Sequence, residues 1–289
     1  ISSIRFGNWF SVARAFVPET SVFELTVPYR SNDDNLKLLW ERVRNMDDTI
    51  LELIARQEYS ITLDASIFDN AEDDEIILCL NYDGLYGINN INRFLQESNP
   101  NEAVQWGIQQ YKIGDPILFN ESERFAPVIY NNMKGKIVRI EVFNSDEADG
   151  YIQFDIELTK VINGMDAWMC DFELLENSER GNSVIRFKVY KTRSTDEDDE
   201  GSSRAVVPFQ VAYAVSIHKA QGLEFRSVKI VITDEVDELI THNIFYTAIT
   251  RAQSKLRIYW TPEVENKVLT NIQPRNINKD VGLLRRYIR

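Results

Sequence analysis

Short apolar runs recur along the chain and are separated by amphipathic stretches. The runs are rich in Val, Ile and Leu, and they lie at Val22–Val27, Glu75–Leu80, Val228–Thr233 and Lys255–Trp260. Continuous apolar runs of this length are typical of strands that are covered on both faces, as in parallel sheets. Because helical patterns lie between them, we expect an α/β domain with a doubly wound parallel sheet.

Other stretches have the spacing of amphipathic helices. Over Leu36–Ile54, apolar residues recur at intervals of three, four and seven, which places them on one face of a helix. Ser31 followed by Asp34 resembles a capping box at the start of this helix, with Asp in place of the usual Glu. We also expect helices over Asn89–Gln96 and Asp237–Thr250.

The pattern changes between residues 113 and 208. Apolar and polar side chains alternate over Ile152–Leu158 and again over Ile185–Tyr190. Alternation with a period of two indicates half-buried antiparallel strands. The sequence therefore predicts a small β module over 113–208 that interrupts one α/β domain made of residues 1–112 and 209–289.

The formal net charge of −13 argues at first against a nucleic-acid partner, because Lys and Arg supply most of the non-specific affinity for phosphates. The charges are unevenly distributed. Residues 1–202 carry 19 Lys or Arg and 37 Asp or Glu, whereas residues 203–289 carry 13 and 8. A local basic groove is enough for a protein that moves along a strand. The acidic run Ser194–Ser203 is expected to form a solvated loop.

The sequence contains no signal for a membrane or for secretion. No run of eighteen apolar residues occurs, and the N-terminal residues lack the pattern of a signal peptide. Cys79 and Cys170 lack the spacing of metal ligands. We therefore expect buried, reduced thiols and a cytoplasmic protein.

Three motifs occur in a characteristic order. Leu25–Ser31 reads LTVPYRS, Val215–Phe225 reads VSIHKAQGLEF, and Phe245–Ala252 reads FYTAITRA. They resemble motifs IV, V and VI of superfamily 1 helicases of the RecD-like and UvrD-like kind. The resemblance implies the second RecA-like domain of an ATP-driven nucleic-acid motor. It also implies that the β module is an SH3-like barrel inserted into this domain.

Two sequence features that an ATPase needs are absent. No Gly-x-x-x-x-Gly-Lys-Ser/Thr loop is present to cradle phosphates, and no acidic pair closes an apolar strand as a source of a Mg²⁺ ligand. The chain begins with Ile1-Ser-Ser-Ile, which resembles the segment that follows motif III in the family. We therefore expect an N-terminal P-loop domain upstream that holds the Mg²⁺ ligands. This chain alone is expected to contain no metal site and to be inactive.

The resemblance assigns contacts with ATP to residues of all three motifs. Arg30 and Arg251 match the two arginines that reach the γ-phosphate as arginine fingers. Tyr29 matches the position whose ring stacks near the adenine. Gly222 permits a close approach of the backbone to a ligand, and Glu224 matches a position that contacts the nucleotide ribose.

Polar side chains of the second motif are expected to contact the nucleic-acid strand. Hydroxyl, imidazole and ammonium groups suit phosphate oxygens, and such contacts position a strand without reading its sequence. The residues assigned to this contact are Ser216, His218, Lys219 and Gln221. The His-Lys-Ala-Gln-Gly form of the motif resembles that of the 5'-to-3' branch.

The sequence therefore predicts the C-terminal half of an ATP-dependent, 5'-to-3' DNA helicase that is monomeric and binds single-stranded DNA. Two alternatives stay open. One is a catalytically inactive, helicase-like module that binds nucleic acid or regulates, and the other is an RNA helicase of the same superfamily, because backbone contacts do not separate RNA from DNA. A further hypothesis gives the β module a strand contact through Arg186, Lys188, Lys191 and Arg193.

Overall fold

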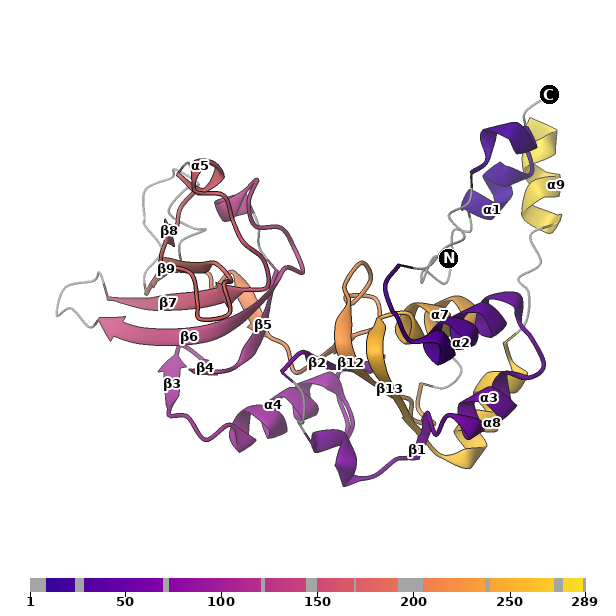
Figure 1. Cartoon of the computed structure of the whole chain (residues 1–289), viewed down its shortest axis with the longest axis horizontal. Coiled ribbons are helices and arrows are strands. Elements are labelled where there is room, and N and C mark those ends of the chain that lie inside the picture. Colours follow the sequence, from indigo (N-terminus) through magenta and orange to yellow (C-terminus); the bar gives the residue numbers. More distant parts are fainter. Residues whose placement is uncertain are drawn as a thin grey trace. The chain divides into compact units, whose positions relative to one another are not determined.

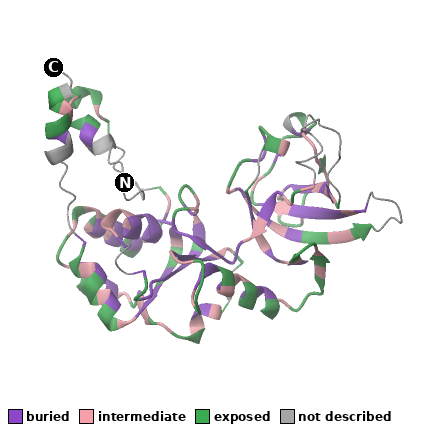
Figure 2. Cartoon of the chain, turned by 180° about the vertical axis from the view of Figure 1, so that it is seen from behind, coloured by how far each residue is buried: buried purple, intermediate pink, exposed green. Residues whose placement is uncertain are grey.

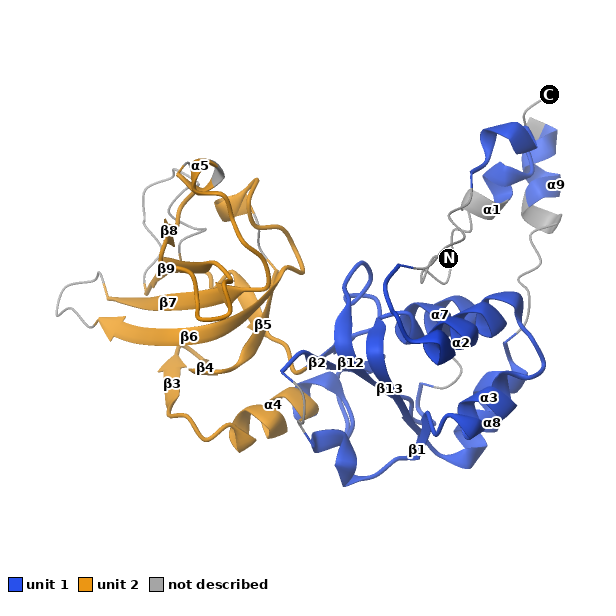
Figure 3. Ribbon diagram, viewed as in Figure 1, with its two compact units in different colours: residues 1–90, 214–289 blue, residues 91–213 orange. Residues whose placement is uncertain are grey.

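The chain forms helices and strands that are arranged in two compact units (Figure 1). The computed structural model describes residues 9–23, 29–69, 73–120, 123–143, 150–168, 170–191, 205–236, 240–272 and 278–287. Unit 1 comprises residues 1–90 and 214–289, and unit 2 comprises residues 91–213 (Figure 3). In sequence, unit 2 is therefore an insertion into unit 1.

Unit 1 is built on a parallel sheet. Within the described residues the sheet has five strands in the order β1-β13-β12-β2-β11, and all neighbours are parallel. In that order they span Ser60–Thr62, Ala252–Trp260, Phe225–Val231, Glu75–Cys79 and Ala214–Ser216. The central strands are almost wholly buried, as expected for strands covered on both faces (Figure 2). The predicted α/β fold with a parallel sheet is confirmed.

Helices pack on this sheet. α2 (Asp34–Asn45) and α7 (His242–Ile249) contact each other and β13, and α7 also contacts β12. Phe245 of α7 stacks on Trp260 of β13 at a centroid distance of 6.0 Å. Further helical segments described in unit 1 are α1 (Trp9–Arg14), η1 (Glu19–Ser21), α3 (Ile50–Arg56), η2 (Ala65–Phe68), α8 (Pro262–Thr270) and α9 (Asn278–Tyr287).

Unit 2 contains an antiparallel sheet. Its described strands follow the order β10-β5-β6-β7-β9-β8. In that order they span Phe209–Val211, Pro116–Phe119, Lys134–Phe143, Tyr151–Leu158, Val184–Tyr190 and Glu173–Leu174. Other elements are the hairpin of β3 (Ala103–Trp106) and β4 (Gln109–Lys112), with α4 (Ile88–Ser98), η3 (Glu123–Phe125) and α5 (Gly164–Ala167).

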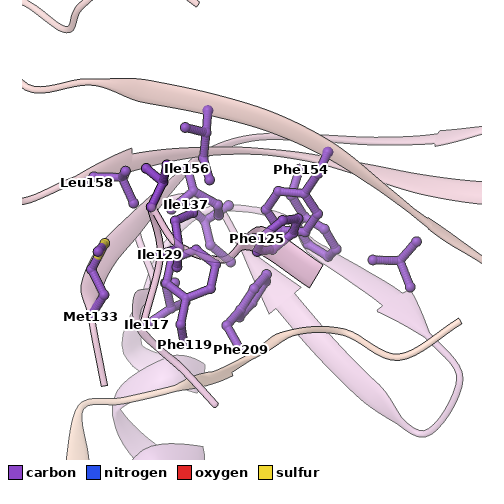
Figure 4. Packing of buried hydrophobic residues seen from close by; sticks show 14 of the residues in the cluster. Ile117, Phe119, Phe125, Ile129, Met133, Ile137, Phe154, Ile156, Leu158 and Phe209 are labelled. Carbon is purple, nitrogen blue, oxygen red and sulfur yellow. The ribbon is translucent and has the colours of Figure 1, made fainter. Parts of the chain in front are cut away.

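One face of this antiparallel sheet carries a dense aromatic core (Figure 4). Phe154 of β7 lies 5.0 Å from Phe209 and 5.2 Å from Tyr111 between ring centroids, both edge to face. Such pairs stabilise a core beyond the effect of area burial. The apolar residues of the two alternating stretches, from Ile152 to Leu158 and from Ile185 to Val189, all belong to the core. The predicted antiparallel strands are confirmed, and β9 is half-buried as expected, whereas the polar Gln153 and Asp155 of β7 are buried as well. The likeness to an SH3 barrel stays a prediction.

The predicted helix over Leu36–Ile54 is wrong in one respect, because the structure has two helices there. α2 ends at Asn45 and α3 begins at Ile50. Met46 lies between them in the left-handed region with φ of 55°, which ends the α-helical path. Asp47 then accepts a hydrogen bond from the backbone N of Thr49 at 2.8 Å, and this turn redirects the chain.

The predicted capping box is also wrong. Asp33 caps α2, and its carboxylate accepts hydrogen bonds from the backbone N of Asn35 at 2.8 Å and of Leu36 at 3.2 Å. Ser31 accepts from the backbone N of Asp33 at 3.0 Å, and its Oγ donates to the carbonyl of Gln253. The hydroxyl of Ser31 therefore ties the start of α2 to β13.

Unit 2 begins earlier in sequence than the predicted module. The carboxylate of Asp115 is fully buried and accepts hydrogen bonds from Gln96, Asn99 and Tyr213 at 2.5, 2.9 and 2.9 Å. The backbone N of Lys112 donates to the same carboxylate at 2.9 Å. A buried charge requires such partners. The Asp115 carboxylate thus links the end of α4 and the end of β4 to the antiparallel sheet. Residues before 113 therefore belong to unit 2.

Other predicted features have mixed outcomes. Val22–Val27 lies mostly outside the described residues, and α7 begins at His242 rather than at Asp237.

Cys79 is buried, and burial raises the pKa of its thiol to about 12, whereas Cys170 is only half-buried. Among the described helices, none is both long and apolar enough to cross a membrane.

Candidate functional site

Arg30 and Glu224 meet in unit 1 although 194 positions separate them in sequence. Nε of Arg30 lies 2.9 Å from Oε1 of Glu224, and Nη1 of Arg30 donates to the carbonyl of Thr250 at 2.9 Å. Nε2 of Gln253 donates to the other carboxylate oxygen of Glu224 at 3.0 Å. Arg30 of the first motif is therefore joined to Glu224 of the second and to Thr250 of the third, and Gln253, directly after the third motif, completes the group.

Arg251 is the buried member of this group. Its Nε donates to the carbonyl of Thr247, its Nη1 to the carbonyl of Leu223 and its Nη2 to Oγ1 of Thr250, at 2.9, 2.9 and 3.1 Å. The residue is 7% exposed, whereas the side chain of Arg30 is 28% exposed. Arg251 therefore fastens the end of α7 to the segment that precedes β12.

The electrostatics of the group follow from two cations beside one carboxylate. Burial, and next the charge of Arg30, lower the pKa of the Arg251 guanidinium to about 10, although Glu224 acts in the opposite direction. Burial raises the pKa of Glu224, but hydrogen bonds from Arg30 and Gln253 and the charges of both arginines outweigh it, so this pKa lies below its usual value. The group is cationic and partly desolvated, which suits an anionic ligand.

Neighbouring contacts hold Arg30 at this place. Ser31, the next residue, donates to the carbonyl of Gln253. On α2, Nε1 of Trp40 donates to the carbonyl of Ile249 at 3.1 Å in the core. The sequence motifs predicted no site role for Ser31, Trp40 or Gln253. Their contribution depends on tertiary contacts, for which the sequence pattern carries no signal.

Tyr29 lies beside this group in sequence and is almost fully exposed. Its exposed fraction is 90%, which is unusual for a ring of this size in a folded domain. The phenol ring is therefore accessible to a planar ligand. The structure shows this accessibility and does not show a partner for the ring among the described residues.

Residues 217–222 form consecutive turns directly after β11. The backbone N of Lys219 donates to Oγ of Ser216 at 3.1 Å, and the backbone N of Gln221 donates to the carbonyl of His218 at 3.2 Å. Ser216 is buried and its hydroxyl takes part in this turn, whereas His218 and Gln221 are exposed. Of the four residues assigned to strand contact, these two are the most accessible.

Gly222 and Lys219 differ in what the structure shows of them: a backbone conformation for Gly222 and a half-buried side chain for Lys219. Gly222 has φ of +90°, and a Cβ built there would meet nothing within 4 Å. The glycine is therefore needed for its backbone conformation, and the structure shows no close approach that demands it. Lys219 is half-buried, and burial lowers the pKa of its ammonium group.

The site residues divide between the two edges of the parallel sheet. Ser216 is the last residue of β11, whereas Glu224 and Arg251 immediately precede β12 and β13. Because the strands are parallel, Ser216 lies at the carboxyl edge and the two charged residues lie at the amino edge. The segment 217–224 connects the edges, so the turns and the charged group are parts of one continuous stretch.

The four basic residues assigned to strand contact in unit 2 are not equivalent. Arg186 donates to both carboxylate oxygens of Asp155 at 2.7 and 2.8 Å, so its charge is already paired. Arg193 lies outside the described residues. Lys188 lies over the ring of Tyr151, with Nζ 4.5 Å from the centroid. Asp155 therefore offsets the charge of Arg186, and the strand contact through this side of the module stays a prediction.

The comparisons with known proteins agree with the fold and the motifs. The sequence family of the UvrD-like helicase C-terminal domain matches residues 211–259, which run from the end of β10 into β13. Pif1 helicase from Candida albicans has a similar structure, with a TM-score of 0.50 and 14% identity, over 90% of this chain and 60% of that one. The fold is therefore that of a RecA-like helicase domain.

Curated relatives of similar sequence include RecD proteins. The RecBCD enzyme subunit RecD of Buchnera aphidicola subsp. Acyrthosiphon pisum is 24% identical over 208 residues, 70% of this chain and 27% of that protein. RecD of Haemophilus influenzae is 25% identical over 179 residues, 57% of this chain and 25% of that protein. The family match and these relatives support a superfamily 1, RecD-like C-terminal half. The chain spans about a quarter of the length of these relatives.

Proposed function

We propose that this chain is the C-terminal motor half of an ATP-dependent, 5'-to-3' DNA helicase. In the proposal, unit 1 is the second RecA-like domain and unit 2 is an SH3-like insertion. The cationic group of Arg30 and Arg251 faces ATP held by an N-terminal P-loop domain of the same polypeptide. The segment 217–224 links this group to a strand of single-stranded DNA.

The observation that carries the proposal is the convergence of Arg30, Glu224 and Arg251. Phosphoryl transfer places negative charge on the γ-phosphoryl oxygens, and positive groups that are already in position lower the barrier. Arg251 is desolvated beside a second cation, and the single carboxylate of Glu224 does not balance both charges, which costs energy. A phosphate at this place would relieve that cost. Glu224 and Gln253 hold Arg30 in position.

The donor set fits the phosphates of ATP and does not fit Mg²⁺. Both arginines offer hydrogen-bond donors, and the exposed ring of Tyr29 offers a stacking surface for adenine. Among the described residues, no cluster of three or more His, Cys, Asp or Glu could hold a metal ion. We therefore assign the Mg²⁺ ligands to the P-loop domain, where the metal would neutralise charge on the transferred phosphoryl group.

The strand contact is assigned to exposed polar groups of the turns. His218 and Gln221 are accessible, and Lys219 supplies an ammonium group beside them. Groups of this kind bind phosphate oxygens without reading sequence, which suits a protein that moves along DNA. Ser216 contributes indirectly, because its hydroxyl accepts the backbone hydrogen bond that shapes the turn.

The ATP assignment is tested in the full-length reading frame that encodes this chain. We expect Arg30→Ala and Arg251→Ala each to lower strand-stimulated ATP turnover by about 10³-fold, with a much smaller effect on ATP affinity. Arg30→Lys should restore little activity, because an ammonium group cannot reproduce the planar fork of a guanidinium. Turnover is measured at saturating ATP, and affinity is measured with a fluorescent ATP analogue.

The matched control is Arg93→Ala. Arg93 is a surface arginine on α4 whose side chain is 74% exposed and pairs with Glu97. We expect this variant to keep turnover within about twofold of the unmodified protein, because surface pairs contribute little. Near-normal turnover in a correctly folded Arg30→Ala variant would show that Arg30 has only a structural role.

A further inference from the structure

Two loops leave neighbouring strands at the carboxyl edge of the parallel sheet in unit 1. Ser216, the last residue of β11, is paired with Cys79, the last residue of β2. The backbone N of Ile217 donates to the carbonyl of Cys79 at 3.0 Å, so the contact continues into the turns. Neighbouring strands lie about 4.8 Å apart. Residues 81–87, which we call the β2–α4 loop, therefore begin beside the turns of residues 217–222.

Hydrogen bonds give the β2–α4 loop a defined shape. The side chain of Asn81 donates to the carbonyl of Asp83 at 2.9 Å, and the side chain of Asn89 donates to the carboxylate of Asp83 at 3.2 Å. A Cβ at Gly87 would lie 2.3 Å from the carbonyl oxygen of Asp83, so only glycine fits there. A loop that is already ordered can bind a ligand without the entropic cost of fixing its backbone.

This ordered loop presents two large apolar side chains to solvent. Tyr82 is 56% exposed and Leu85 is 66% exposed. They lie three positions apart in the same loop, so they form a small apolar surface with one aromatic ring. Such a ring offers a flat face to another planar group. The loop thus holds a stacking surface beside the turns.

The charges at this edge are divided between the loop and the turns. The β2–α4 loop contains Asp83 and no Lys or Arg. A second carboxylate lies against it, because Oε2 of Glu235 is 3.6 Å from the place that a Cβ at Gly84 would take. The turns contain His218 and Lys219 and no acidic residue. Phosphates are therefore attracted to the turns and repelled by the loop, whereas a neutral base can approach the loop.

We propose that Tyr82 stacks on a base of the single strand whose phosphates contact the turns. The face of an aromatic ring binds every base, so this contact holds a strand without reading its sequence. Leu85 offers an apolar contact to the same base. The inference rests on the strand contact proposed for the turns, and it adds a base-binding surface to that contact. The ATP site at the amino edge of the sheet is not involved.

The test compares two fluorescent strands on the protein encoded by the full-length reading frame. One is an oligothymidine, and the other is an abasic strand of the same length, which has the same phosphates and no bases. We expect Tyr82→Ala to weaken oligothymidine binding by about tenfold, as for the loss of one stacked base, and to leave binding of the abasic strand unchanged. Tyr82→Trp keeps an aromatic face and should bind both strands as the unmodified protein does. Fluorescence anisotropy measures binding, and thermal unfolding verifies that each variant is folded.

The matched control is Tyr130→Ala. Tyr130 is 55% exposed, which is close to the exposure of Tyr82, but it belongs to unit 2. We expect this variant to bind both strands as the unmodified protein does. Lys219→Gln tests the phosphate contact separately. It should weaken binding of both strands and flatten its dependence on salt, because one phosphate contact is lost.

The outcomes separate the stacking contact from the phosphate contact. Equal weakening of both strands by Tyr82→Ala, or no weakening of either, would overturn the stacking assignment even if Lys219→Gln behaves as expected. Selective weakening of oligothymidine by Tyr82→Ala supports stacking, and an unchanged Lys219→Gln variant would then show that the phosphate contact is wrongly assigned. Failure of the unmodified protein to bind either strand would overturn both.

Discussion

Glu224 is the residue on which the candidate site depends most. Its two carboxylate oxygens accept hydrogen bonds from Arg30 and Gln253 at 2.9 and 3.0 Å. It is also the carboxylate that offsets the charge of the buried Arg251. A neutral side chain at this position would leave two cations close together without an anion, which is unfavourable in a partly desolvated site.

The lowered pKa of Glu224 predicts a pH dependence of stability. An acid whose pKa is lowered in the folded state stabilises that state at pH values above its usual pKa of 4.5, and this stabilisation is lost as the pH falls through the lowered folded value. We therefore expect Glu224→Gln to lower the melting temperature at pH 7. The difference from the unmodified chain should shrink as the pH falls below 4.5.

Differential scanning calorimetry across pH 3 to 7 measures this difference, with pH values chosen around the usual pKa of a glutamate. Glu97→Gln is the control, since Glu97 forms a surface pair with Arg93 that contributes little to stability. A constant difference between Glu224→Gln and the unmodified chain across this range would contradict the assigned role of the carboxylate.

At the scale of elements, α2 and α3 show what a sequence pattern can and cannot predict. The apolar spacing over Leu36–Ile54 indicated helical structure correctly. The apolar residues at that spacing are buried in both helices, up to Val43 in α2 and from Ile50 in α3. The break at Met46 was missed, since methionine rarely adopts positive φ and gives no sequence signal for it. The motif residues were found by their resemblance to helicase motifs, whereas the contacts of Ser31 and Gln253 became visible only in the folded chain.

The left-handed conformation of Met46 predicts a stabilising substitution. Glycine adopts this conformation without the steric cost that a Cβ causes, so Met46→Gly is expected to raise the free energy of unfolding by about 0.5–1 kcal/mol. Glu41→Gly, at an exposed interior position of the same helix, should lower it by about 1 kcal/mol. Urea denaturation of both variants checks the opposite signs, and a loss of stability in Met46→Gly would contradict the argument.

The elements of unit 2 are joined at Asp115, and this predicts a local effect. Removing the buried carboxylate leaves donors from Gln96, Asn99 and Tyr213 without their acceptor. Asp115→Ala should therefore cost about 3 kcal/mol, or roughly a hundredfold in hydrogen-exchange protection of β5 and β7. Glu102→Ala, at an exposed position before β3, is the control. Unchanged protection in Asp115→Ala would show that the carboxylate does not hold the unit together.

At the scale of the whole molecule, the positive charge is concentrated in the C-terminal part of the chain. Residues 203–289, which include Glu224, Arg251 and the turns, carry 13 Lys or Arg and 8 Asp or Glu. Residues 91–213, which form unit 2, carry 13 Lys or Arg and 21 Asp or Glu. A molecule with a net charge of −13 can therefore still present a cationic site to ATP and to a strand. The sequence alone showed this distribution, because net charge by segment needs no structure.

The central claim is that this chain supplies only the cationic half of an ATP site. The most direct measurement compares ATP turnover by the 289-residue chain alone with turnover by the full-length reading frame, each with and without single-stranded DNA. We predict no turnover by the chain alone, because it lacks a phosphate-binding loop, and strand-stimulated turnover by the full-length protein. Strand-stimulated turnover by the chain alone at a rate comparable to that of the full-length protein would contradict the account.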